Sequence, residues 1–370
     1  MTMTTFQSSS LWLGRIDRPG TGPCVVTLRD GHIFDITSKT APTTRDILER
    51  DDTADYVRNT SGTDLGPVGN VRTWLAPCDF QAVKACGVTF AGSMVERVIE
   101  EQAAGDPARA EDIRDRIGAR IGDSLTNIVP GSEAAQKVKQ ALIEEGLWSQ
   151  YLEVGIGPDA EVFSKAQVLS SVGHGSDVGL HPISTWNNPE PEVVLAVTSR
   201  GDIKGATLGN DVNLRDVEGR SALLLSKAKD NNASCSIGPM IRLFDEGFSL
   251  DDVRQAELTL TVRGEDGFHL TGHSSMAQIS RDPADLVRQT IGRHHQYPDG
   301  LMLFLGTLFA PTQDRDTPGG GFTHKLGDVV TIANDKLGAL TNIVRLSTEC
   351  PEWTFGASHL MRNLARRNLL

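Results

Sequence analysis

The sequence has few aromatic residues and fewer basic than acidic side chains. Aromatic residues make up 5% of the 370 residues, and 36 basic against 48 acidic side chains give a net charge of −12. A surface of that charge repels phosphate backbones at long range, whereas nucleic-acid binders carry a positive field. We therefore expect binding neither to nucleic acid nor to an anionic membrane surface.

Cysteines are also few, and long hydrophobic runs are missing. The five cysteines are widely spaced, form no Cys-x-x-Cys pair and have no histidine at zinc-ligand spacing. The first residues include no basic stretch, and their apolar cluster, Leu11-Trp12-Leu13, is too short for a signal peptide or a membrane span. These features predict a reduced compartment and a cytoplasmic location.

Length and composition predict one large domain with a smaller one beside it. Short apolar runs on either side of the turn Arg29-Asp30-Gly31 predict a small β-rich N-terminal domain over residues 1–75. A polar stretch from Asp51 to Gly69 is rich in turn-forming residues and predicts a loop or linker. We expect the main domain to occupy residues 76–370.

A helical pattern occupies residues 94–146, at the start of the main domain. Isoleucines recur at every fourth position, at Ile113, Ile117 and Ile121. A further helix is expected from a cap at Ser132 to Gly146, a residue suited to a left-handed stop. Apolar and polar residues alternate again after Gly146, as in Leu258 to Val262. The pattern predicts a helical insertion in a β framework.

Two glutamates, Glu190 and Glu192, stand immediately before an apolar run. Side chains two residues apart on an extended chain point to the same face, and Pro189 and Pro191 keep this segment extended. Two carboxylates beside a buried strand repel each other unless a cation or a shared proton compensates. We expect a divalent metal here, although an isolated Glu-x-Glu is more often a solvated face.

Asp211 supplies a third acid, because it follows a short apolar strand and a glycine in Gly205-Ala206-Thr207-Leu208-Gly209-Asn210-Asp211. Three carboxylate oxygens, with water completing an octahedron, suit Mg²⁺, with Mn²⁺ as the second candidate. Asp211 alone is typical of a turn. The metal prediction therefore depends on the combination of Glu190, Glu192 and Asp211.

The order and spacing of several motifs resemble the fumarylacetoacetate hydrolase superfamily over roughly residues 75 to 345. The motifs are Gly87-Val88-Thr89-Phe90-x-x-Ser93, Gly157 through Lys165, Glu190-x-Glu192, Asp211-Val212-x-x-Arg215-Asp216, Lys229, Gly238-Pro239, Leu305-Gly306-Thr307 and Lys325 through Val330. Within the superfamily, the run from Ala228 to Pro239 is similar to the branch of 2-keto-3-deoxypentonate dehydratases, such as those acting on 2-keto-3-deoxy-D-arabinonate.

This resemblance implies a mixed, β-rich α+β fold. Together with the segments above, it predicts a fumarylacetoacetate hydrolase-type β-sheet catalytic domain over residues 76–370, a helical insertion at about 94–146 and a small N-terminal domain over 1–75. It also implies Mg²⁺-dependent dehydration of a 2-keto-3-deoxypentonate, of the D-arabinonate or D-xylonate type, to 2,5-dioxopentanoate in sugar-acid catabolism. The expected assembly is a homodimer or a dimer of dimers.

The first motif distinguishes members of the superfamily that catalyse elimination from those that catalyse hydrolysis. Hydrolytic members carry a water-activating histidine after an Asn-Tyr pair in the first motif, whereas this chain has Thr89, Phe90 and Ser93. The resemblance therefore favours C–O elimination over C–C bond hydrolysis. The alternatives are hydrolysis of a 2,4-diketo acid, decarboxylation, and a metal-dependent sugar-acid binding protein without turnover.

Four further residues are candidates for work on a 2-keto acid substrate. We expect Glu161 to transfer protons and Lys229 to abstract a proton or stabilise an enolate, and these two roles are interchangeable. The resemblance places Thr307 against the substrate carboxylate and gives Ser93 a catalytic or substrate-binding position. Each of the four also has an ordinary structural alternative. Glu161 is compatible with a surface strand residue and Lys229 with a solvated loop lysine. Thr307 is compatible with a strand-end hydroxyl and Ser93 with a helix cap.

Overall fold

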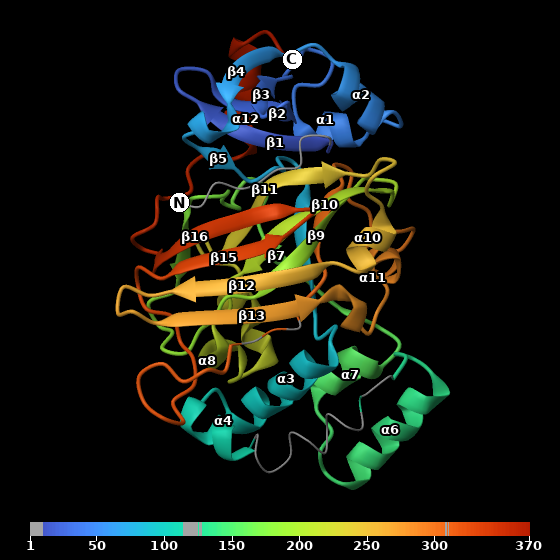
Figure 1. Ribbon diagram of the computed structural model, residues 1–370. Coiled ribbons are helices and arrows are strands. Elements are labelled where there is room, and N and C mark those ends of the chain that lie inside the picture. Colours follow the sequence, from blue (N-terminus) through green and yellow to red (C-terminus); the bar gives the residue numbers. More distant parts are fainter. Residues whose placement is uncertain (1–9, 114–124, 126–127, 308, 310) are drawn as a thin grey trace.

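The computed structural model describes residues 10–113, 125, 128–307, 309 and 311–370 (Figure 1). Its centre consists of two sheets packed face to face, with helices at both ends and along one side. The first sheet has 11 strands in the order β4-β3-β2-β1-β11-β10-β9-β14-β6-β7, and β5 pairs with β1. The second has five strands in the order β13-β12-β15-β16-β8.

The strands of the first sheet are β1 (Trp12–Arg18), β2 (Gly22–Arg29), β3 (His32–Asp35), β4 (Thr63–Pro67), β5 (Trp74–Leu75), β6 (Ala82–Gly87), β7 (Glu161–Ala166), β9 (Pro191–Val197), β10 (Ile203–Asp211), β11 (Cys235–Leu243) and β14 (Leu301–Phe304). Those of the second sheet are β8 (Asp177–Leu180), β12 (Glu257–Arg263), β13 (His269–Ser275), β15 (Val329–Asn334) and β16 (Gly338–Leu346).

The helices are α1 (Thr44–Leu48), α2 (Thr53–Asn59), α3 (Ala91–Ala103), α4 (Pro107–Ile113), α6 (Glu133–Glu144), α7 (Gln150–Ile156), α8 (Arg215–Glu218), α9 (Leu225–Lys229), α10 (Leu250–Arg254), α11 (Pro283–Thr290) and α12 (Ala357–Arg366). Short 3-10 turns are η1 (Val68–Asn70), η3 (Ala222–Leu224) and η4 (Met276–Gln278). Within the described ranges, none of the helices combines the length and the apolar composition that a bilayer span requires.

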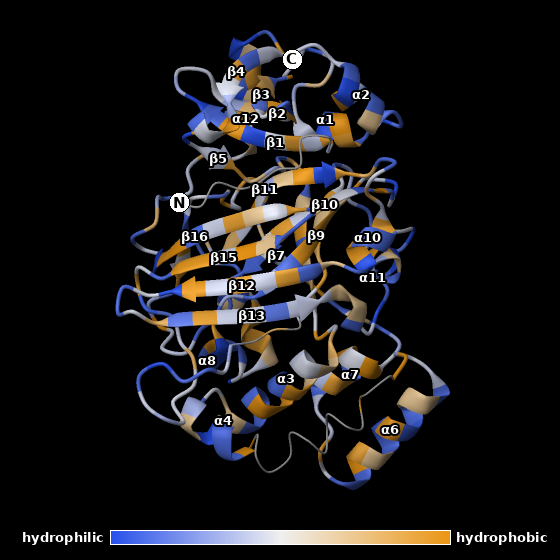
Figure 2. Cartoon of the chain, viewed as in Figure 1, coloured by the Kyte–Doolittle hydropathy of each residue, from blue (hydrophilic) through white to orange (hydrophobic). Residues whose placement is uncertain are grey.

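The main core lies between the two sheets. Every residue of β9 is buried, whereas β12 alternates between buried and more exposed positions, as its sequence predicts. Val193 and Leu195 on β9 belong to the same buried cluster as Leu258 and Leu260 on β12. Figure 2 shows that β9 and β15 are mostly apolar, while α4 and α6 mix apolar and polar residues. The apolar contact between the sheets therefore fixes the strand ends around which the site is built.

The N-terminal strands continue the main sheet through the antiparallel pair β1 and β11. The predicted loop between residues 51 and 69 is wrong, because this stretch contains α2, β4 and η1. Only Thr53 and Val57 of α2 are buried, so its apolar signal in the sequence is weak. Near the other end of the chain, Asn363 on α12 donates a hydrogen bond to the Thr21 carbonyl at 2.8 Å. The domain boundary at residue 75 stays a prediction.

The segment between β6 and β7 is helical in its described parts. Its helices α3, α4, α6 and α7 share an apolar core of their own, which is separate from the core between the sheets. Ser132 caps α6 as predicted, and Gly146 has a φ of 69°. Ile113 ends α4, while Ile117 and Ile121 lie outside the described residues. Whether this segment is an insertion relative to the family fold stays a prediction.

Candidate active site

Glu190, Glu192 and Asp211 meet at one end of the main sheet. Glu190 precedes β9, Glu192 is the second residue of β9, and Asp211 is the last residue of its antiparallel neighbour β10. The Asp211 amide donates a hydrogen bond to the Glu190 carbonyl at 3.1 Å. One carboxylate oxygen of each residue lies within 4.8 Å of the other two, and all three side chains are buried. The pairing of β9 with β10 therefore produces the convergence that the sequence predicts.

Two buried lysines contact this three-acid cluster. Lys229 Nζ lies 2.5 Å from Glu190 Oε2 and 3.1 Å from Asp211 Oδ2. Lys165 Nζ lies 3.0 Å from Asp211 Oδ1 on the other side. Burial alone would raise the pKa of Asp211, but Lys165 and Lys229 outweigh it and hold this pKa below its usual value. Lys229 is 2% exposed, so it is not a solvated loop lysine.

Glu192 differs from the other two acids in its partners. Among the described residues, no lysine or arginine forms an ion pair with it, and its Oε2 accepts a hydrogen bond from the Gly306 amide at 2.7 Å. Burial, together with the charges of Asp211 and Glu190, raises the pKa of Glu192 well above its usual value. A divalent cation held by the three oxygens would remove this repulsion. The donor set thus fits Mg²⁺, which prefers carboxylate oxygens.

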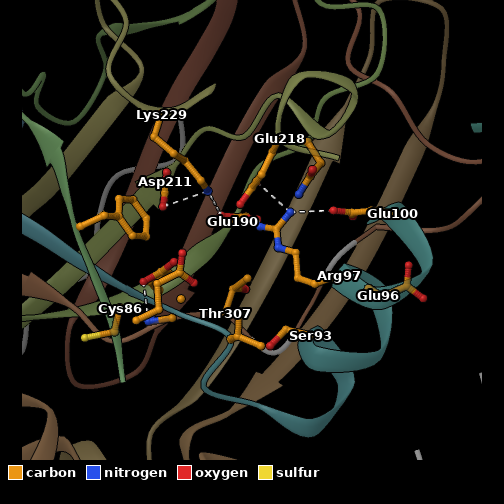
Figure 3. A pocket seen from close by; sticks show the side chains of 17 residues that line it. Cys86, Ser93, Glu96, Arg97, Glu100, Glu190, Asp211, Glu218, Lys229 and Thr307 are labelled. Carbon is orange, nitrogen blue, oxygen red and sulfur yellow. Dashed lines mark hydrogen bonds and ion pairs between the residues drawn. The ribbon is translucent and has the colours of Figure 1, made fainter. Parts of the chain in front are cut away.

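A single cavity contains all seven side chains that the sequence selects: the three acids together with Ser93, Glu161, Lys229 and Thr307. Figure 3 labels five of them, Ser93, Glu190, Asp211, Lys229 and Thr307. The structure therefore brings together residues from β7, β9, β10, α3, α9 and the segment after β14. Their individual roles stay predictions, but their common location agrees with one reaction site.

Glu161 is the first residue of β7 and pairs in register with Gly87 of β6. Its Oε2 occupies the space that a Cβ on Gly87 would need. Burial raises the pKa of Glu161, although Arg97 and Lys229 oppose the change. A carboxyl group with a raised pKa suits proton transfer near neutral pH.

Ser93 and Thr307 lie on the same cavity from different elements. Ser93 is in the first turn of α3, and its Oγ donates a hydrogen bond to the Phe90 carbonyl at 2.8 Å. It therefore interacts with the N-terminal end of the helix as well as lining the cavity. Thr307 follows β14 and is 8% exposed, and its Oγ1 donates to the Phe309 carbonyl at 3.2 Å.

Arg97 and Glu218 also line the cavity, although the sequence patterns did not select them. Arg97 lies one turn after Ser93 on α3, and its guanidinium contacts Glu190 at 2.7 Å, Glu100 at 2.7 Å and Glu218 at 2.8 Å (Figure 3). The spacing of Ser93, Arg97 and Glu100 places them on one helix face, which was the available signal. This signal does not by itself point to the site, because the helical pattern predicts only an insertion in a β framework.

Gly87→Ala tests the close approach of β6 to Glu161 without removing any polar group. A methyl group on Gly87 requires the Glu161 carboxyl to move, because that carboxyl fills the same space. We expect turnover to fall by about 100-fold, in line with the loss of a positioned proton-transfer group, with little change in melting temperature. Gly356→Ala is the control, since no atom lies within 4 Å of the added Cβ. Equal activity of the two variants would contradict a catalytic position for Glu161.

A family model described as fumarylacetoacetate (FAA) hydrolase C-terminal matches residues 158–345. The chain is 30% identical over 201 residues to a Haloferax volcanii protein named "Probable 2-keto-3-deoxyxylonate dehydratase". It is 30% identical over 185 residues to the 2-dehydro-3-deoxy-D-arabinonate dehydratase of Saccharolobus solfataricus. These alignments cover 54% and 50% of this chain, and 65% and 58% of the relatives. The chain thus matches less than two thirds of either relative's length.

Solved structures extend the similarity to most of the chain. A 2-keto-3-deoxy-D-arabinonate dehydratase complexed with magnesium and 2,5-dioxopentanoate matches with a TM-score of 0.63 at 21% identity, covering 91% of this chain and 99% of that one. A fumarylacetoacetate hydrolase from psychrophilic Exiguobacterium antarcticum matches with a TM-score of 0.57 at 16% identity, covering 91% and 100%. At these identities the likeness concerns the fold. The predicted sheet-rich mixed fold is therefore confirmed.

Proposed function

Because the chain belongs to the fumarylacetoacetate hydrolase family, we propose that it is a Mg²⁺-dependent dehydratase that converts a 2-keto-3-deoxypentonate to 2,5-dioxopentanoate. The observation that carries this proposal is the buried cluster of Glu190, Glu192 and Asp211 in a cavity that also contains Glu161. Both relatives aligned by sequence are named as dehydratases of such sugar acids.

The three-acid cluster would hold the metal, with Mn²⁺ as the second candidate. When bound, a divalent cation polarises the keto group of the substrate and makes the neighbouring C3 hydrogens more acidic. Glu161 takes the C3 proton, and its raised pKa prepares it for this task near neutral pH. Lys229 keeps a positive charge beside Glu190 and Asp211, where it offsets their negative charges. Thr307 binds the substrate carboxylate, and Ser93 contacts the substrate from α3.

The composition of the cavity supports elimination over hydrolysis. None of the described residues that line it is a histidine, so the water-activating group of the hydrolytic members has no counterpart there. Thr89 does not substitute for it, because this residue is buried and its Oγ1 donates to the Leu305 carbonyl at 2.7 Å. A binding protein without turnover has no need for a carboxyl group of raised pKa beside the cluster, as Glu161 provides.

The assembly and location are part of the same proposal. The family resemblance supports a homodimer or a dimer of dimers. A reduced, cytoplasmic location is supported by the five cysteines, which are all free and buried. In such a compartment the enzyme would serve the catabolism of pentose-derived sugar acids.

An assay with two sugar acids tests the proposal. The purified protein is incubated with Mg²⁺ and either 2-keto-3-deoxy-D-xylonate or 2-keto-3-deoxy-D-arabinonate, and products are followed by NMR. We expect 2,5-dioxopentanoate without pyruvate, and we expect EDTA to stop the reaction. Pyruvate as the main product would indicate C–C cleavage instead. Binding of the sugar acid without any product would favour the non-catalytic alternative.

A further inference from the structure

Glu218 is a cavity-lining carboxylate that lies outside the three-acid cluster. It is the last residue of α8 and is 4% exposed. Its Oε2 lies 2.8 Å from Arg97 Nη1, but no described residue makes a directional hydrogen bond to this oxygen. Buried acceptors are seldom left without a hydrogen bond unless a ligand or water supplies the donor. This oxygen is therefore available to a hydroxyl group in the cavity.

The groups around Glu218 come from four other elements. Arg97 and Glu100 face it from α3, Lys229 from α9 and Glu190 from the start of β9. Tyr151 on α7 donates to the Glu218 backbone carbonyl at 3.5 Å. Burial raises the pKa of Glu218 to about 7, although Arg97 and Lys229 oppose the change. The carboxyl group therefore exchanges a proton near neutral pH.

Glu161 and Glu218 lie on different walls of the cavity. Glu161 is on the wall formed by β6 and β7, where it touches Gly87. Glu218 is on the wall formed by α8 and α3, where it touches Arg97. Two carboxyl groups outside the metal cluster suit a reaction with two proton transfers at different atoms.

We propose that Glu218 is a second catalytic residue, which protonates the departing C4 hydroxyl while Glu161 removes the proton from C3. This assignment rests on the proposed function. The C3–H bond breaks and its electron pair forms the enolate, and that pair then forms the C3–C4 double bond as the C4–O bond breaks. The oxygen takes the proton of Glu218 and leaves as water. Transfer of a proton from C5 to C3 and tautomerisation then give 2,5-dioxopentanoate.

Glu100 provides a matched comparison, because it is buried in the same network but has different partners. Its oxygens lie 2.7 Å from Arg97 and 2.6 Å from Arg215 Nε. Burial alone would raise the pKa of Glu100, but the two arginines outweigh it and lower this pKa. Glu100 therefore stays ionised and positions Arg97 and Arg215, and it has no proton to deliver.

Exchange of pyruvate protons separates the two carboxyl roles. Pyruvate has a methyl group in place of C3 and no leaving group, so Mg²⁺-dependent exchange of its protons in D₂O requires the base but not the acid. We expect Glu218→Gln to lower dehydration by about 100-fold or more and to keep pyruvate exchange within about 3-fold of wild type. Glu161→Gln is expected to lose both reactions. Glu100→Gln is expected to lower both by the same factor, as a positioning residue does.

Two results would overturn the role of Glu218: dehydration by Glu218→Gln within about 3-fold of wild type, or equal losses of dehydration and exchange. Glu218→Asp is the second variant, for the case that Glu218→Gln does not fold. This variant keeps a carboxyl group, but its side chain is shorter by one methylene. We therefore expect its dehydration rate to fall more than its rate of pyruvate proton exchange. If wild type exchanges pyruvate protons but makes no 2,5-dioxopentanoate, the proposed function fails, which is distinct from a failure of Glu218 alone.

Discussion

Glu192→Gln is expected to weaken Mg²⁺ binding by at least about 100-fold, since changing even an indirect partner of a metal ligand costs 10- to 100-fold. The amide keeps the shape of the side chain and its hydrogen bond from Gly306, but it removes one of three negative charges. Dehydration should fall in parallel. In EDTA the melting temperature of the variant should equal or exceed that of wild type, because the buried repulsion with Glu190 and Asp211 is relieved.

Titration calorimetry with Mg²⁺ and thermal unfolding with and without EDTA measure these effects. Glu246→Gln is the matched control, because it removes one negative charge from an exposed position. Wild-type protein and this control should both gain thermal stability from Mg²⁺, whereas Glu192→Gln should not. Wild-type Mg²⁺ affinity in Glu192→Gln would show that the three-acid cluster is not the metal site.

Glu161→Gln is expected to lower dehydration by about 100- to 10,000-fold, the usual contribution of a positioned acid or base. The amide fits beside Gly87 but cannot accept the C3 proton. Mg²⁺ affinity should stay within about 3-fold of wild type, because Glu161 lies outside the three-acid cluster. The loss should therefore appear in kcat, with KM little changed.

The measurement is steady-state kinetics at saturating Mg²⁺, together with calorimetric Mg²⁺ affinity. Ser164→Ala is a control on the same strand, since Ser164 is exposed and its Oγ accepts a hydrogen bond from Lys84 Nζ at 2.9 Å. We expect this control to keep wild-type activity. Full activity of Glu161→Gln would show that Glu161 does not remove the C3 proton.

The three-acid cluster could be predicted from sequence because its signal is local. Glu190 and Glu192 share a face of one extended segment, and Asp211 ends an adjacent apolar strand. Hydrophobic alternation from Leu258 to Val262 likewise located β12. In these cases the residues that determine the structure are neighbours along the chain or on adjacent strands.

The second wall of the cavity could not be predicted in the same way. Arg97 and Glu218 become neighbours only because α3 packs beside α8, where Arg215 Nε lies 2.6 Å from Glu100. That contact joins segments more than a hundred residues apart, and the spacing of Ser93, Arg97 and Glu100 on one helix face does not indicate which distant segment faces them. The burial of Lys229 could not be predicted for a similar reason, since its polar neighbours in sequence are typical of an exposed loop.

The helices α3, α4, α6 and α7 pack around a core of their own, apart from the core between the two sheets. The proposed metal ligands lie on or beside β9 and β10, whereas Ser93 and Arg97 lie on α3, which packs in the separate helical core. Mutations in these helices at positions that do not contact Glu190 should therefore change the wall of the cavity and leave the three-acid cluster in place. Substitutions of Ser93 should therefore change sugar preference in the proposed reaction and leave Mg²⁺ affinity unchanged, because Ser93 lies outside the three-acid cluster.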